Sequence, residues 1–170
     1  MKKAVLMVIV VAVVAVVAVA AFIMVSNQPA ASTITKHYSG GGISFDYPSA
    51  WETGSSSGNL ITLTDRPENI AFGVAEAPLP AGATLKTFND TTVMALNPLQ
   101  IISGDFPTVD GFSACRTVLD INNNQTTVRI LFVCFVKDNT VYILTGAALP
   151  GGFDTARASF DAIINSFNVQ

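Results

Sequence analysis

Apolar and polar side chains alternate from Ile43 to Tyr47, which is the two-residue period of a strand with one buried face. Pro48 has no backbone N–H to donate to a neighbouring strand, so this strand is expected to end there. Trp51, the only tryptophan of the chain, follows closely and can fold its ring over the strand. We therefore take residues 43–48 as the first strand of a folded domain.

The last third of the chain predicts three consecutive strands, at residues 112–121, 127–137 and 140–147. Short polar connections join them, and strands joined so closely must pair antiparallel. The middle strand is apolar on both faces apart from Arg129, which indicates that the sheet is covered on both sides.

Two stretches with apolar residues at helical spacing can supply these covering layers. They are residues 84–96, with Thr84 as the expected N-cap, and residues 155–167, with Asp154 as the expected N-cap. Further short strands are predicted at residues 60–64, 70–77 and 100–103. The sequence thus predicts an α+β domain in which an antiparallel β-sheet is sandwiched between helices, an α-β-α sandwich.

An uncharged apolar run extends from residue 4 to residue 25, directly after Lys2 and Lys3. As a helix it would measure about 33 Å, enough to cross a hydrocarbon core of about 30 Å. We expect an uncleaved signal anchor, with a cleaved signal peptide as the alternative. The two lysines would stay in the cytoplasm and place residues 26–170 outside it, in a single-pass protein of the cell membrane.

The predicted organisation therefore has three parts: a membrane anchor at residues 1–25, a tether at residues 26–41 and a folded domain at residues 42–170. The tether holds Pro29, small residues and glycines without apolar periodicity. It also contains His37, the only histidine, which we expect to be solvated.

Charge and motifs exclude several classes of function. The formal net charge is −3, and the chain without its two N-terminal lysines carries 7 basic and 12 acidic residues. A mildly acidic domain without a cluster of lysine and arginine does not favour nucleic acid as a partner. With one histidine in a tether and no zinc, dinucleotide or phosphate-binding motif, the sequence predicts no catalytic, cofactor or metal residues. We therefore expect the protein not to be an enzyme.

The two cysteines are expected to face each other. Placing Asn124 and Gln125 at the tip of a hairpin puts Cys115 opposite Cys134, and the same register puts Asp120 opposite Arg129. Outside the cytoplasm such a pair should oxidise to a disulfide. Two reduced cysteines buried in the core are the alternative.

Two Asn-x-Thr sequons begin at Asn89 and Asn124. Because the domain is expected outside the cytoplasm, both are candidates for glycosylation. The position of Asn124 at a hairpin tip makes it the better candidate of the two.

The stretch of residues 38–51, which contains Gly-Ile-Ser-Phe-Asp-Tyr-Pro-Ser-Ala-Trp, resembles the opening signature of PsbP-related proteins. Residues 142–145 and 160–167 resemble the last strand and last helix of that family, so the likeness covers about residues 38–168. It implies an α-β-α sandwich around an antiparallel sheet and an accessory binding protein without chemistry of its own. The chain resembles most the prokaryotic members of unassigned function, and the binding residues of the photosynthetic members have no counterpart motif here.

These observations together predict a membrane-anchored, extracytoplasmic, non-catalytic binding or accessory module with a protein partner at the membrane surface. A sensor or carrier of a small solute is the alternative, and it would need a concave pocket. Loops on a rigid scaffold usually carry recognition, so the contact surface is expected in four connections. They are residues 54–58, 65–69, 78–82 and 150–152.

Overall fold

The computed structural model describes residues 35–54 and 60–170, which form two antiparallel sheets and two helices. The larger sheet has eight strands in the order β3-β4-β5-β10-β9-β8-β6, with the short β7 also paired to β8. Its strands are β3 (Glu52–Gly54), β4 (Ile61–Asp65), β5 (Ile70–Pro78), β6 (Gln100–Asp105), β7 (Thr108–Val109), β8 (Phe112–Asn123), β9 (Thr126–Lys137) and β10 (Thr140–Ala148).

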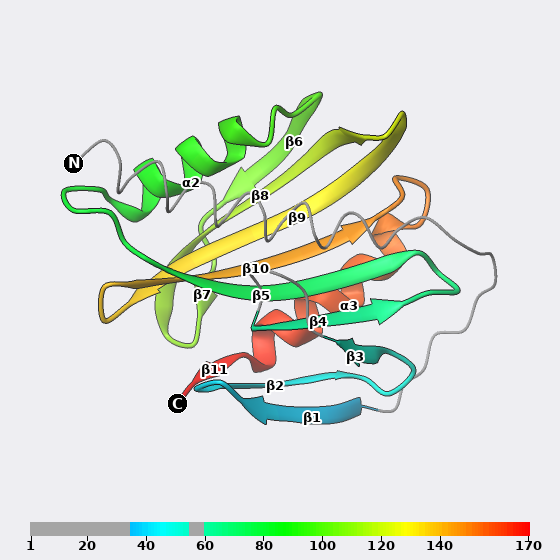
Figure 1. Ribbon diagram of the computed structural model, residues 1–170, viewed down its shortest axis with the longest axis horizontal. Helices are drawn as coiled ribbons and strands as arrows, with labels where there is room; N and C mark the ends of the chain where they lie inside the picture. Colours follow the sequence, from blue (N-terminus) through cyan, green and yellow to red (C-terminus); the bar gives the residue numbers. More distant parts are fainter. Residues whose placement is uncertain (1–34, 55–59) are drawn as a thin grey trace.

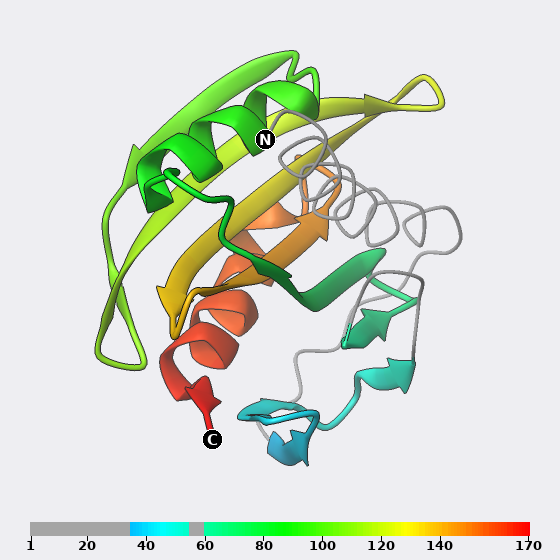
Figure 2. The same ribbon diagram turned by 60° about the vertical axis from the view of Figure 1, so that its left-hand side comes forward.

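The two helices cover opposite faces of this sheet (Figures 1 and 2). Helix α2 (Leu85–Ala95) packs its Phe88 and Val93 on the cluster that contains Ile130 and Phe132 of β9. Helix α3 (Phe153–Ser166) packs on the other face, in the cluster that contains Leu131, Val133 and Phe135 of β9. The prediction of an α+β fold with an antiparallel sheet between helices is confirmed.

Strand β9 is buried on both faces, as its sequence predicts. Residues 130–135 are all fully buried, and alternate residues enter the two clusters. Such a strand has no solvated side, so any polar side chain within it needs a partner. Arg129 has one, because its guanidinium contacts Asp120 across the hairpin at 2.8 and 3.0 Å.

The predicted register of the β8–β9 hairpin is also confirmed. Cys115 lies opposite Cys134 and Asp120 lies opposite Arg129. Asn124 and Gln125 form the tip with φ angles of 49° and 69°, the left-handed conformation that a two-residue hairpin turn of type I′ requires at both positions.

Both predicted helices form, with one difference at a cap. Thr84 caps α2, because its Oγ1 accepts a hydrogen bond from the backbone N–H of Thr87 at 3.1 Å. Helix α3 begins earlier than predicted, and Gly152 rather than Asp154 is its N-cap residue. Asp154 instead lies in the first turn, where a carboxylate interacts favourably with the positive end of the helix dipole.

The first predicted strand belongs to a second sheet that the sequence did not predict. Strand β2 (Ile43–Pro48) pairs with β1 (Thr35–Gly40) on one side and with β11 (Asn168–Val169) on the other. The apolar face of β2 packs on α3, so this helix lies between the small sheet and the large one (Figure 1). Trp51 is buried, and its ring packs edge-on against that of Phe160 in α3.

The predicted tether is too long at its C-terminal end. Residues 35–40 form β1, and every one of them pairs with β2. His37 therefore lies on a strand, where its Nδ1 is 2.7 Å from Oδ1 of Asp46. Both side chains are exposed, so the prediction that His37 is solvated is correct while its assignment to a linker is wrong.

The predicted membrane anchor, residues 4–25, lies outside the described residues, as does the earlier part of the tether. Among residues 35–54 and 60–170, neither helix is long and apolar enough to cross a membrane.

Candidate functional site

The exposed large hydrophobic side chains of the described residues all come from one short segment. They are Met94, Leu99, Ile101, Ile102 and Phe106, which we call the apolar edge. Met94 is 65% exposed and Phe106 is 73% exposed, so neither contributes to either core cluster. Single exposed hydrophobic residues are common, but a group of five within thirteen positions indicates an interaction surface.

The strand order of the sheet explains why these side chains are exposed. Strand β6 is the last strand of the large sheet and, in the described part of the chain, has a strand neighbour on one side only, β8. Its pairing with β8 is interrupted at Ile102, where the register shifts between Ile101 and Ser103. A bulge of this kind at an edge bends the strand and limits continuous pairing with another strand.

A pocket of about 300 Å³ lies beside the apolar edge, between α2 on one side and β6 and β8 on the other. Its apolar lining comes from Val93 and Met94 of α2, from Ile101 of β6 and from Phe106, which follows β6. Cys115 and Thr117 of β8 and Asn89 of α2 also line it. This volume is at the lower end of the range of small-molecule sites and is large enough for one bulky apolar side chain.

Ion pairs neutralise the charged residues of the pocket. Lys86 Nζ lies 2.5 Å from Oδ2 of Asp90, one helical turn away, and holds the pKa of that carboxyl below its usual value. Arg116 contacts both carboxylate oxygens of Asp105, with Nε 2.7 Å from Oδ1, and lowers the pKa of Asp105 in the same way. The opposite charges cancel, so the pocket favours an uncharged occupant.

Asn89 lies on the buried side of α2 and faces β8 and β9. Its amide Nδ2 is 3.5 Å from Oγ1 of Thr117, and its Oδ1 is 3.8 Å from the Cys134 sulfur. The side chain is 8% exposed and leaves no room for an oligosaccharide. The prediction that Asn89 faces solvent as a glycosylation candidate is therefore wrong, because this face of α2 is the one that packs on the sheet.

The other glycosylation candidate, Asn124, is exposed at the tip of the β8–β9 hairpin, as predicted. Its modification stays a prediction. Cys115 and Cys134 also lie where the sequence places them, but both are free thiols in the structure. The predicted disulfide is therefore not formed here, and both cysteines are buried.

Asp65, which the sequence analysis placed at the start of a connection, ends β4 as a buried residue. Its side chain accepts a hydrogen bond from the Trp51 side chain. Burial raises the pKa of Asp65. Across residues 35–54 and 60–170, no three side chains of the His, Cys, Asp and Glu types lie close enough together to hold a metal ion.

The sequence analysis did not single out the apolar edge. It expected the contact surface in four connections, and that expectation stays a prediction, with residues 55–58 of the first connection lying outside the described residues. The available signal was the run Leu99-Gln100-Ile101-Ile102 followed by Phe106, whose apolar residues lack the clean alternation of a half-buried strand. Only the position of β6 at the end of the sheet shows that these residues face solvent.

Comparison with known proteins gives a fold and no closer relationship. No family model matches the chain, and no curated protein matches its sequence. Among solved structures, cyanobacterial PsbP from Synechocystis superposes with a TM-score of 0.59 at 17% identity, covering 86% of this chain and 99% of that one. LpqN from Mycobacterium tuberculosis gives 0.58 at 17% identity, over 84% and 99%.

The Ran-binding protein Mog1p from Saccharomyces cerevisiae gives a TM-score of 0.62 at 13% identity, over 81% of this chain and 96% of that one. The chain therefore has the fold shared by PsbP and Mog1 proteins, which confirms the fold that the sequence resemblance implied. Identities this low say nothing about which residues act in function.

Proposed function

We propose that this protein is a non-catalytic binding module, anchored in the cell membrane and facing outward, that holds a partner protein at its apolar edge. The observation that carries the proposal is the grouping of five exposed side chains, Met94, Leu99, Ile101, Ile102 and Phe106, in one short segment. Three of them, Met94, Ile101 and Phe106, line one pocket. Burying such side chains against a partner contributes about 25 cal/mol for each Å² of apolar surface removed from water.

The partner suited to this surface is an uncharged, apolar segment of a membrane protein. Ion pairing of Lys86 with Asp90 and of Arg116 with Asp105 leaves no net charge in the pocket to attract an acidic or basic peptide. The bulge at Ile102 limits backbone pairing with β6, so recognition rests on side chains. A single bulky apolar side chain of the partner would fill the pocket.

The anchor would be residues 4–25, as the sequence predicts. Only residues 26–34 then separate it from β1, and a chain of this length spans at most about 30 Å. A domain held so close to the bilayer meets a membrane-embedded partner at a high effective concentration. The domain itself could therefore bind weakly and still be occupied.

The descriptions of two proteins with this fold support an accessory role for this chain. Mog1p is described as Ran-binding, and LpqN as involved in cell envelope biogenesis. Neither description names a reaction.

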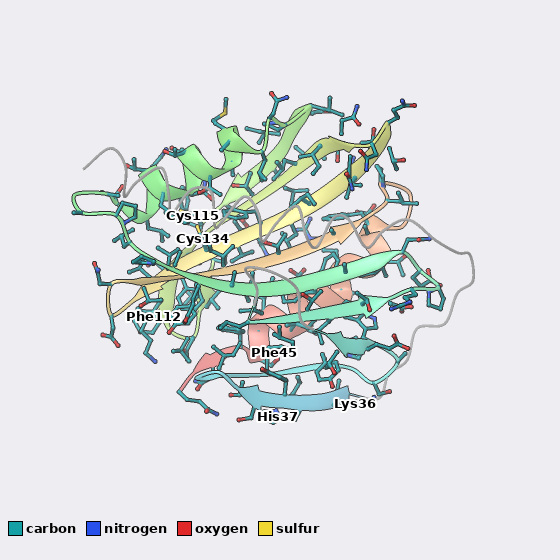
Figure 3. The ribbon with its side chains drawn as sticks, viewed as in Figure 1. Lys36, His37, Phe45, Phe112, Cys115 and Cys134 are labelled. Carbon is teal, nitrogen blue, oxygen red and sulfur yellow. The ribbon has the colours of Figure 1, made fainter. Side chains whose placement is uncertain are left out.

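Site-specific photocrosslinking in native membranes tests the binding surface. A benzophenone amino acid at Phe106 should give a reproducible adduct with one membrane protein, identified by mass spectrometry. The same group at Lys36, which is exposed on β1 at the opposite end of the molecule, is the control (Figure 3). Equal adducts from both positions, or none from position 106, would contradict the proposed surface.

The proposed orientation of the chain in the membrane is tested separately. An epitope tag placed after Gln170 should be accessible to antibody on intact cells once the cell wall is removed, and Lys2 should not be accessible to impermeant amine reagents. A tag that becomes accessible only after the membrane is permeabilised would place the domain on the inside.

A carrier or sensor of a small solute is the second candidate, and the pocket is the observation that favours it. An uncharged compound that raises the melting temperature of the wild type, but not that of Met94→Trp, would support this function. If crosslinking finds no partner and a compound gives such a shift, these results would favour the solute-binding function over the protein-binding one.

A further inference from the structure

Two cysteine thiols lie near the pocket, and only one of them lines it. Cys115 of β8 lines the pocket, whereas Cys134 of β9 is fully buried behind it. Figure 3 shows the two side by side on adjacent strands next to α2. A molecule in the pocket would therefore meet Cys115 first and would reach Cys134 only through it.

The hairpin fixes the spacing of the pair. Asn123 and Thr126 close the two-residue turn and so form a hydrogen-bonded pair. Counting eight positions back along each strand, without a shift in register, places Cys115 and Cys134 at a pair of the same type. The Cα atoms of such pairs lie about 5.5 Å apart, within the range that a disulfide spans. The spacing of the two strands is thus compatible with a disulfide between Cys115 and Cys134.

The two sulfurs also differ in acidity. A hydrogen bond from Cys134 stabilises the Cys115 thiolate and lowers the pKa of Cys115 to about 7, in spite of burial. The same interaction, together with burial, raises the pKa of Cys134. Among the charged groups around Cys115, Asp90 raises its pKa and Lys86 lowers it, and these two are themselves ion-paired. Arg116 and Asp105, also at the pocket, form a second ion pair.

We propose that Cys115 and Cys134 are an attacking and a resolving thiol, and that the pocket admits a small uncharged organic disulfide to them. The proposal goes beyond the binding function and does not depend on it. It describes one oxidation per protein molecule rather than catalytic turnover.

The reaction has two steps. The Cys115 thiolate attacks one sulfur of the disulfide R–S–S–R, forms a mixed disulfide with it and releases R–S⁻. The Cys134 sulfur then attacks the Cys115 sulfur, gives up its proton and releases the second R–S⁻. The small disulfide is reduced by two electrons, and Cys115 and Cys134 are oxidised to one cross-strand disulfide. A dithiol reverses the change.

The neutral aromatic disulfide 2,2′-dithiodipyridine is a suitable probe for the full-length native protein. The wild type should release two thiopyridones per chain and end without an adduct, lighter by two hydrogens in intact mass. Cys134→Ser should release one thiopyridone and keep a stable adduct. Cys115→Ser should react at least about tenfold more slowly than wild type, because Cys134 is buried and its thiol is seldom ionised.

Two substitutions at exposed positions test whether the small disulfide reaches Cys115 through the pocket. Met94→Trp narrows the pocket and should slow the reaction, whereas Leu99→Trp, on the same apolar edge but outside the pocket lining, should not. The rate should also rise with pH and reach half its maximum near pH 7, as Cys115 ionises.

The site of the first reaction can also be measured on the wild type, so the test does not require the cysteine variants to fold. Peptide mapping after a brief exposure should find the first adduct on Cys115. A first adduct on Cys134, a lasting adduct on the wild type, or no reaction of the native protein would each overturn the proposal.

Discussion

Phe160 of α3 lies directly over the backbone of Gly146 in β10, so closely that a Cβ at position 146 would be 2.7 Å from Cδ2 of the ring. Phe160 is itself fully buried, and it contacts the rings of Trp51, Phe72 and Phe153. The ring therefore has no free space into which to move. The absence of a side chain at position 146 is what allows α3 to approach the sheet at this point.

Gly146→Ala should destabilise the protein by about 1–3 kcal/mol, because the added methyl group overpacks a rigid site. Urea unfolding followed by the fluorescence of Trp51, which packs against Phe160, measures the change. Gly151→Ala is the control, because nothing lies within 4 Å of the added Cβ. Its free energy of unfolding should change by no more than about 0.5 kcal/mol. An equal loss in both variants would show that the close approach of Phe160 is not the cause.

The pair of Asp120 and Arg129 should contribute more than an exposed ion pair. It has two hydrogen bonds, and the side chains are only 12% and 25% exposed. A double-mutant cycle with Asp120→Ala and Arg129→Ala should give a coupling energy of about 1–2 kcal/mol. The exposed pair of Lys86 and Asp90 is the comparison, and its coupling energy should be clearly smaller. A coupling energy near zero for the first pair would contradict this account.

Gln125→Gly should stabilise the hairpin by about 0.5–1 kcal/mol. Gln125 holds a φ of 69°, which glycine adopts without strain, although glycine also gains freedom in the unfolded chain. The backbone hydrogen bond from residue 125 to Oδ1 of Asn122 is kept. Thr127→Gly, in the extended part of β9, should instead destabilise by about 0.5–1 kcal/mol. Thermal unfolding of the two variants should therefore shift in opposite directions.

Protonation of two carboxyl groups in acid should change the free energy of unfolding in opposite directions. Arg116 lowers the pKa of Asp105 in the folded state, so Asp105 stabilises the protein at neutral pH and this contribution is lost as the pH falls below about 4. Burial raises the pKa of Asp65, so its charged form opposes folding and protonation in acid relieves the cost.

Urea midpoints measured from pH 7 down to pH 3 by circular dichroism provide the check. Relative to Asp105→Asn, the wild type should lose stability as the pH falls. Relative to Asp65→Asn, it should gain stability. Asp105 is more than half exposed, so its effect should be the smaller one. Parallel pH curves for the wild type and both variants would refute the assignment.

The β8–β9 hairpin could be predicted in detail because several local signals agree. The Asn124-Gln125 turn sets the length of the connection, and in the resulting register Asp120 meets Arg129 and Cys115 meets Cys134. The double-faced burial of β9 follows from its unbroken apolar run. In each case the deciding information lies within about twenty residues of sequence.

The second sheet and the apolar edge depend on information that is not local. Residues 35–40 are mostly exposed and lack apolar periodicity, so only their pairing with β2 makes them a strand. Ile101 and Ile102 would be buried in a central strand and are exposed because β6 is the last strand of its sheet. Asn89 is buried because neighbouring Phe88 and Val93 turn that face of α2 toward the sheet.

The pairing of β2 with β11 joins the two ends of the domain, and this has a consequence for biosynthesis. Val169 lies opposite Ile43, and Ser166 hydrogen-bonds the backbone of Asp46, 120 residues away. A chain that emerges from a ribosome or translocon N-terminus first would present Ile43, Phe45 and Tyr47 long before α3 and β11 arrive to cover them. The domain would thus complete its fold only after residues 168 and 169 emerge, and the apolar face of β2 would stay uncovered until then.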